Sequence, residues 1–235
     1  MDVLTENADV FVRGFFVTFQ ICILAAIGAL LLGTVLAAMR ISPIPPLRWL
    51  GTAYVTVLRN TPLTIVFFFV AFGLPELGSR ADFLRIPLLD QLFTRLGTDL
   101  AFFRFAILAL TVYTAAFVCE ALRAGINAVQ PGQSEAGRSL GLTFLQNLRL
   151  IVLPQAGRYS VVPLGSVIVA MLKNSALAGA FGVFGDLFQS GQDLTSAQGY
   201  AAIPVFLGIS IGYLVMTVPL GLTLDRIERR QAVTR

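Results

Sequence analysis

Five apolar runs are the feature that most limits how this chain can fold. They cover residues 15–38, 49–72, 103–122, 159–177 and 203–224. A helix of about 20 residues spans the hydrocarbon core of a bilayer, which is about 30 Å thick. The runs do not alternate polar and apolar residues, so helices and not barrel strands must satisfy the backbone in lipid. The sequence therefore predicts an all-α integral membrane protein with about five transmembrane helices.

The composition agrees with a membrane protein. Of the 235 residues, 56% are hydrophobic and only 13% are charged, whereas a soluble domain carries about 25% charged residues. The net charge of +4 does not indicate a nucleic-acid partner, because the arginines lie between apolar runs and form no soluble basic face. The acidic N-terminal segment lacks the positive region of a signal peptide, so we expect the first run to remain as a span. We find no internal repeat or linker and predict a single domain, residues 1–235.

Basic residues collect in cytoplasmic loops, and their distribution predicts the orientation. The loops after the first and third runs and the C-terminal tail together hold ten: Arg40, Arg48, Arg123, Arg138, Arg149, Arg158, Arg226, Arg229, Arg230 and Arg235. The other side holds five, offset by several acidic residues: Arg13, Arg80, Arg85, Arg95 and Arg104. The N-terminus is therefore predicted outside and the C-terminus in the cytoplasm. On the outer side, residues 81–97 show helical apolar spacing, which fits an interfacial helix or a cap on the bundle.

The chain offers little material for an enzyme active site. It contains no histidine, and its two cysteines, Cys22 and Cys119, lie inside apolar runs as expected for buried free thiols. No pair of carboxylates lies within the spans. We therefore expect neither catalysis nor a metal site in this chain.

The longest cytoplasmic segment, residues 123–158, has the most informative pattern. Ser134 can cap a helix opened by Glu135, and Gly141 would end that helix. A second short helix is predicted over residues 142–153, and Pro154 is predicted to mark a turn back toward the membrane. The segment should thus form two short helices held at an angle beneath the bundle.

These residues resemble a known family. Glu135, Ala136 and Gly137, then Gly141 with Leu142 after it, and finally Ile151, Leu153 and Pro154 follow the EAA-loop pattern of ABC importer permeases at every spacing. Gly137 stands where the pattern has its second alanine, and both residues allow close helix approach. The segments 59–63 (RNTPL), 113–125 (YTAAFVCEALRAG) and 172–177 (LKNSAL) resemble those of polar amino-acid permeases. Asn60 is more similar to the glutamate-importing branch.

The resemblance implies a permease of the type I importer kind in a bacterial cytoplasmic membrane, with the coupling loop at residues 123–158. Such a subunit forms half of a translocation path with a second permease, identical or related, and receives amino acids from an extracytoplasmic binding protein. A separate ATPase binds ATP and Mg²⁺ and drives the movement of the spans through the 135–154 loop. The resemblance therefore implies that this chain itself binds no cofactor. No Walker A motif is present, and Leu172 precedes the only lysine.

Polar residues within spans need a partner or a wet cavity. Arg59 either holds helices together or binds substrate, and Pro62 beside it predicts a broken helix. Glu120 is expected to pair with Arg123 one turn away, with a ligand contact as the alternative. Lys173 would bind a substrate carboxylate or form an ion pair with Glu120. The full set of candidate substrate-path residues is Arg59, Asn60, Thr61, Thr64, Tyr113, Glu120, Lys173, Asn174 and Ser175.

Two other function classes fit the sequence less well. A secondary amino-acid transporter or channel not driven by ATP would often show inverted repeats, and the five runs have no such symmetry. A membrane-embedded enzyme would need reactive groups that the spans lack.

Overall fold

The computed structural model describes residues 2–76, 101–183 and 185–232, and all of the regular structure in these ranges is helical. The predicted external segment 81–97 lies outside the described residues. The N-terminal half comprises α1 (Asp2–Glu6), α2 (Ala8–Ile41), α3 (Pro45–Asn60), α4 (Leu63–Phe68), a π-helical turn (Phe69–Gly73) and α5 (Leu74–Glu76). The C-terminal half comprises α7 (Ala101–Asn127), α8 (Pro131–Ser139), α9 (Phe144–Asn147), a second π-helical turn (Leu148–Val152), α10 (Leu153–Asn174), α11 (Ala176–Ala180), α12 (Leu187–Ser196) and α13 (Ala202–Ala232).

Four helices in the described part of the chain are long and apolar enough to cross a membrane: Ala8–Ile41, Phe102–Asn127, Phe144–Ala180 and Ala202–Arg230. They contain the first, third, fourth and fifth predicted spans. The second predicted span, residues 49–72, is two helices, Pro45–Asn60 and Leu63–Gly73, bent by 106°. Counting this pair as one broken span gives five, and the break predicted at Pro62 is confirmed.

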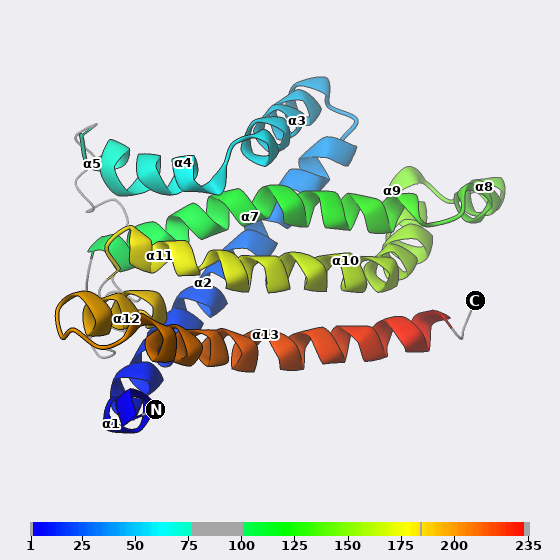
Figure 1. Cartoon of the computed structure of the whole chain (residues 1–235). Helices are drawn as coiled ribbons and strands as arrows, with labels where there is room; N and C mark the ends of the chain where they lie inside the picture. The colour runs from blue at the N-terminus through cyan, green and yellow to red at the C-terminus, as the bar shows by residue number, and fades with distance from the viewer. Residues whose placement is uncertain (1, 77–100, 184, 233–235) are drawn as a thin grey trace.

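The spans pack around α7. Helices α7, α10 and α13 run side by side, and α2 crosses them diagonally (Figure 1). The largest buried cluster joins α2, α4, α7 and α10, with Ile21, Phe67, Leu110 and Met171 at its centre. Cys22 and Cys119 are buried free thiols, as predicted. Large apolar side chains on α13, such as Ile203 and Phe206, stay exposed, as expected where lipid or another subunit covers the surface.

Two predictions about the cytoplasmic segment are wrong in detail. Helix α8 begins at Pro131, so Ser134 lies inside the helix and does not cap it. Proline suits this first position because the N–H that it lacks would have no partner there. Pro154 does not end the second helix either, because one helix continues from Phe144 to Ala180. The π-helical turn Leu148–Val152 shifts the hydrogen-bond register, and Pro154 falls where the α-helix restarts.

Candidate functional site

The break between α3 and α4 presents a short polar segment. Thr61 is extended, and its N–H bonds the Leu58 carbonyl, which lies four residues before Pro62, at 3.4 Å. The Thr61 hydroxyl donates to the Val57 carbonyl at 2.8 Å, and the Asn60 amide to the Thr56 carbonyl at 2.7 Å. These side chains therefore bond the end of their own helix, although both residues, like Thr64, remain surface-accessible.

Glu120 is the centre of an ion cluster. The predicted pair with Arg123 is present, with Arg123 Nε 3.3 Å from Glu120 Oε2. Arg59 Nη1 from α3 lies 3.3 Å from Glu120 Oε1, and Arg40 from α2 bonds the same oxygen. Within the described residues, the ion partners of Glu120 are these three arginines. The alternative in which Lys173 forms an ion pair with Glu120 is therefore wrong. Sequence reasoning missed Arg40, although its place at the end of an apolar run indicated the need for a counter-charge.

A second candidate region, mostly apolar with a few polar groups, lies between α7 and α10. A cavity of about 310 Å³ is lined there by Tyr113, Thr114, Phe117, Ser166, Val167, Ala170, Met171 and Asn174. Tyr113 and Asn174, two of the predicted path residues, thus come together from helices far apart in the sequence. Lys173 is exposed beside Asn174 at the end of α10, whereas Ser175 is buried and donates to the Leu172 carbonyl at 2.8 Å. The cavity combines aromatic walls with a few hydroxyl and amide groups, as small-molecule sites do.

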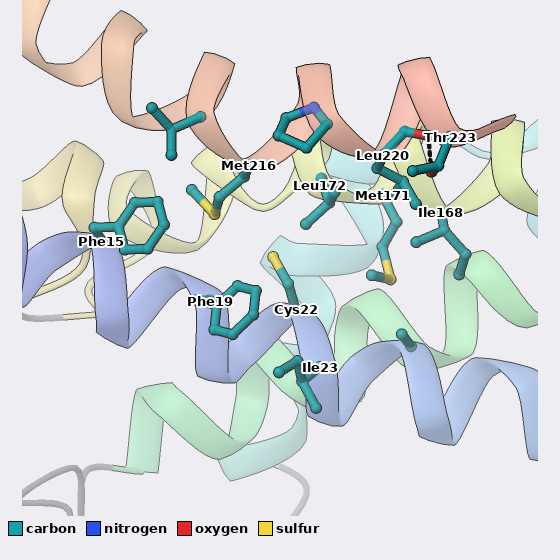
Figure 2. Close-up of a pocket in the computed structure, with 13 residues that line it drawn as sticks. Phe15, Phe19, Cys22, Ile23, Ile168, Met171, Leu172, Met216, Leu220 and Thr223 are labelled. Carbon is teal, nitrogen blue, oxygen red and sulfur yellow. Dashed lines mark hydrogen bonds between the residues drawn. The ribbon is translucent and has the colours of Figure 1, made fainter. Parts of the chain in front are cut away.

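A larger cavity of about 490 Å³ lies between α2, α10 and α13. Figure 2 shows Phe15, Phe19 and Cys22 of α2 facing Met216 and Leu220 of α13. Its walls are almost entirely apolar, and the Thr223 hydroxyl is bonded to the Leu220 carbonyl at 2.7 Å. Such walls offer a charged amino acid no compensation for lost hydration. The cavity between α7 and α10 is also mostly apolar, but it brings together Tyr113 and Asn174, two of the predicted path residues, and is therefore the better candidate for a substrate contact.

The segment between α7 and α10, predicted to be cytoplasmic, forms two helices joined by a tight turn. Helix α8 ends at Ser139, and Gly141 follows with φ of +84°, a left-handed conformation that favours glycine. Thr143 then caps α9 through a reciprocal capping box with Gln146. The predicted helix over residues 142–153 therefore starts two residues later, at Phe144, and Leu142 belongs to the turn.

This polar segment carries a group of exposed apolar side chains, which we call the apolar patch: Leu140, Phe144, Leu145 and Leu150. Their exposed fractions are 84%, 66%, 69% and 63%. Glu135 and Ala136 are also exposed on α8, as is Pro154 at the start of α10. Apolar side chains grouped outside the spans are typical of a protein docking surface.

Comparison with known proteins gives a consistent result. A family model described as binding-protein-dependent transport system inner membrane component matches residues 14–233. The chain is 39% identical over 228 residues to the glutamate transport system permease protein GluC of Corynebacterium efficiens, which covers 94% of this chain and 93% of the relative. It is 36% identical over 230 residues to the probable glutamine ABC transporter permease protein GlnM of Bacillus subtilis, at 98% and 97% coverage. A crystal structure of an amino acid ABC transporter with histidines matches with a TM-score of 0.81 at 30% identity, over 97% of this chain and 96% of that chain.

Proposed function

This chain belongs to the family of binding-protein-dependent transport system inner membrane components, and on that premise we propose that it carries amino acids of the glutamate or glutamine type. It is the multi-pass transmembrane subunit of an ATP-driven importer of polar amino acids in the inner membrane. The subunit is not an enzyme and belongs to a family whose members carry no cofactor. ATP is hydrolysed by ATPase partners, and a binding protein delivers the substrate.

The coupling role is proposed for the 135–154 loop. Its exposed residues Glu135 and Ala136 and the apolar patch offer a helix surface that an ATPase groove can cover. Helix α9 continues without a gap into α10 as one helix from Phe144 to Ala180. A displacement of the loop would therefore reach the cavity between α7 and α10 through one continuous helix. This continuity is the observation that best supports the proposed coupling.

The orientation is proposed from charge and position together. Helices α8 and α9 and the C-terminal, arginine-rich end of α13 lie at the same end of the molecule, opposite α1 and α12 (Figure 1). Arginines mark the cytoplasmic side, so this arrangement supports an outer N-terminus and a cytoplasmic C-terminus.

The substrate contact is proposed for the cavity between α7 and α10. Tyr113, Ser166 and Asn174 supply hydroxyl and amide groups there, and Lys173 is exposed at the same end of α10. A lysine exposed within a span is costly in lipid, so we infer that it faces a water-filled path and attracts the carboxylates of the substrate. Arg59 and Glu120 are held by their ion cluster and are proposed to be structural. We propose that the substrate path also passes the helix break between α3 and α4, where it is lined by Asn60, Thr61 and Thr64.

A second permease, identical or related, is proposed to complete the path. The cavity between α7 and α10 takes its walls from these two helices alone. Another surface must therefore close it before an amino acid can cross without meeting lipid. Exposed Phe68 and Phe69 on the neighbouring α4 segment offer apolar surface for such a subunit.

The substrate is tested by uptake into proteoliposomes that hold this subunit with its ATPase, its partner permease and its binding protein. We expect ATP-dependent, vanadate-sensitive uptake of labelled glutamate, competed by glutamine but not by arginine or histidine. Uptake without ATP would favour a secondary transporter, and strong competition by arginine would contradict the proposed substrate.

The cavity is tested in the same vesicles with Asn174→Ala. Losing a hydrogen bond to a charged ligand should raise the KM for glutamate roughly tenfold while kcat changes little. Ser210→Ala is the matched control, because the Ser210 hydroxyl bonds the Phe206 carbonyl on α13 at 2.7 Å and does not line this cavity. Equal KM values for the two variants would remove Asn174 from the substrate path.

A further inference from the structure

Gly137 is the one position where the cytoplasmic loop departs from the EAA pattern, and its surroundings explain the departure. It is buried on the inner side of α8, which faces the helix that starts at α9. A Cβ atom added at Gly137 would lie 2.5 Å from Ile151 Cδ1 and 2.7 Å from Asn147 Oδ1. Both contacts are shorter than real Cβ atoms tolerate. An alanine here therefore needs Asn147 and Ile151 to move.

Asn147 occupies this space because it bridges the two helices. Its amide nitrogen donates to the Ser134 hydroxyl at 2.8 Å and to the Ser134 carbonyl at 3.0 Å. The side chain is 5% exposed, in a loop whose other polar side chains mostly face solvent. Its Oδ1 is buried, and no hydrogen-bond partner for it is found among the described residues. A buried amide with two bonds across an interface is expensive to displace, so its position is fixed.

We propose that Asn147 is a positioning residue, which locks α8 onto the long helix that enters the membrane, and that Gly137 is the space this lock requires. The proposal rests on the coupling role proposed above for the loop. Ser134 and Gly137 lie on α8, whereas Asn147 lies in the first turn of the helix Phe144–Ala180. With the lock in place, α8 and this helix move as one body. Without it, α8 can yield at the Gly141 turn, and force from the ATPase is absorbed in the loop.

The proposed lock predicts how much amino acid is imported for each ATP hydrolysed. Asn147→Ala removes both bonds, and Asn147→Leu fills a similar space with a side chain that can neither donate to Ser134 nor accept from it. We expect both variants to assemble with the ATPase and to hydrolyse ATP. The amount of amino acid imported per ATP should fall roughly fivefold, the effect of losing one or two buried hydrogen bonds.

The pairing of Gly137 with Asn147 is tested by a double-mutant cycle. Gly137→Ala alone should lower import per ATP, because its methyl group displaces the amide. In the Asn147→Ala background the same substitution should have a much smaller effect, since the methyl group fills the space vacated by the amide and meets only Ile151 Cδ1, the end of a flexible side chain. Gly132→Ala on α8 is the matched control, because nothing lies within 4 Å of a Cβ added there.

The outcomes separate this inference from the proposed function. A wild-type complex without ATP-driven import contradicts the proposed function itself. Wild-type import combined with an unchanged ratio of import to ATP in both Asn147 variants overturns the lock and leaves the function standing. Equal effects of Gly137→Ala in the two backgrounds overturn the pairing. Co-purification of the ATPase with each variant shows whether a fall in import reflects lost assembly, an outcome that would also overturn the lock as a positioning device.

Discussion

At the scale of single residues, Glu120 shows how one carboxylate can organise three helices. It receives Arg40 from α2, Arg59 from α3 and Arg123 from its own helix. The carboxylate side chain is 21% exposed, and that of Arg40 is 14% exposed. A charge so placed is stabilised by its partners and not by water, so its removal would leave three cations facing one another. The ion pair of Arg59 with Glu120 is the observation that supports the structural role proposed for Arg59.

Asp186 is the residue whose ionisation should affect stability. It lies between the helices Phe144–Ala180 and Ala202–Arg230, is fully buried, and caps α12 by accepting a 2.7 Å bond from the Gln189 N–H. Burial raises the pKa of its carboxyl from 3.8 to about 7. Cys22 of α2 and Tyr213 of α13 are the titratable groups that face it. The folded protein therefore keeps a proton that the unfolded chain releases at neutral pH.

The sign of the pH effect follows from that proton. Between about pH 4 and about pH 7 the folded state binds more protons, so the free energy of unfolding falls as the pH rises, and the loss is complete above pH 7. Asp186→Asn retains the capping oxygen and has no charge to bury. We expect the melting temperature of the detergent-solubilised protein to fall less from about pH 5 to about pH 8 in the variant than in the wild type. Parallel curves would contradict this prediction.

At the scale of elements, the turn between α8 and α9 depends on one backbone conformation. Gly141 has φ of +84°, and nothing lies within 4 Å of an added Cβ, so the penalty for a side chain is conformational and not steric. Asparagine adopts this region more readily than a β-branched residue. We expect Gly141→Val to reduce ATPase binding more than Gly141→Asn, by roughly threefold to tenfold in Kd. The measurement is a pull-down titration with the purified ATPase. Equal Kd values would show that the turn is not needed for docking.

At the scale of the whole molecule, the bundle depends on close approach between α7 and α10. A Cβ added at Gly125 would lie 2.6 Å from the Ala156 carbonyl oxygen and 2.9 Å from the Ser160 nitrogen, both backbone atoms that cannot rotate away. Small residues at such contacts let membrane helices pack. Gly125→Ala should therefore lower the melting temperature in detergent, with a loss of about 1–3 kcal/mol in stability. Gly157→Ala is the matched control, since nothing lies within 4 Å of its added Cβ. A similar loss in both variants would contradict this account.

The parts of the fold that local patterns specify were predictable from the sequence. The apolar runs marked the spans, Pro62 marked the break, and Gly141 marked the end of α8. The errors came from reading cap and stop signals singly: Pro131 opens α8 before Ser134, and the π-helical turn carries the helix past Pro154. Both depend on hydrogen-bond registers that a residue pattern does not encode.

What the sequence alone determined is the membrane class, the four or five candidate spans and the family, because hydrophobic length and motif spacing are one-dimensional properties. What only the tertiary structure decided is which polar residues meet. In the structure, Glu120 forms ion pairs with two further arginines, Arg40 and Arg59. Tyr113 and Asn174 line one cavity, and Asn147 fills the space beside Gly137. Such contacts join residues far apart in the chain or on different helices, and they follow from how helices cross. Crossing is set by the packing of many side chains together and not by any local pattern.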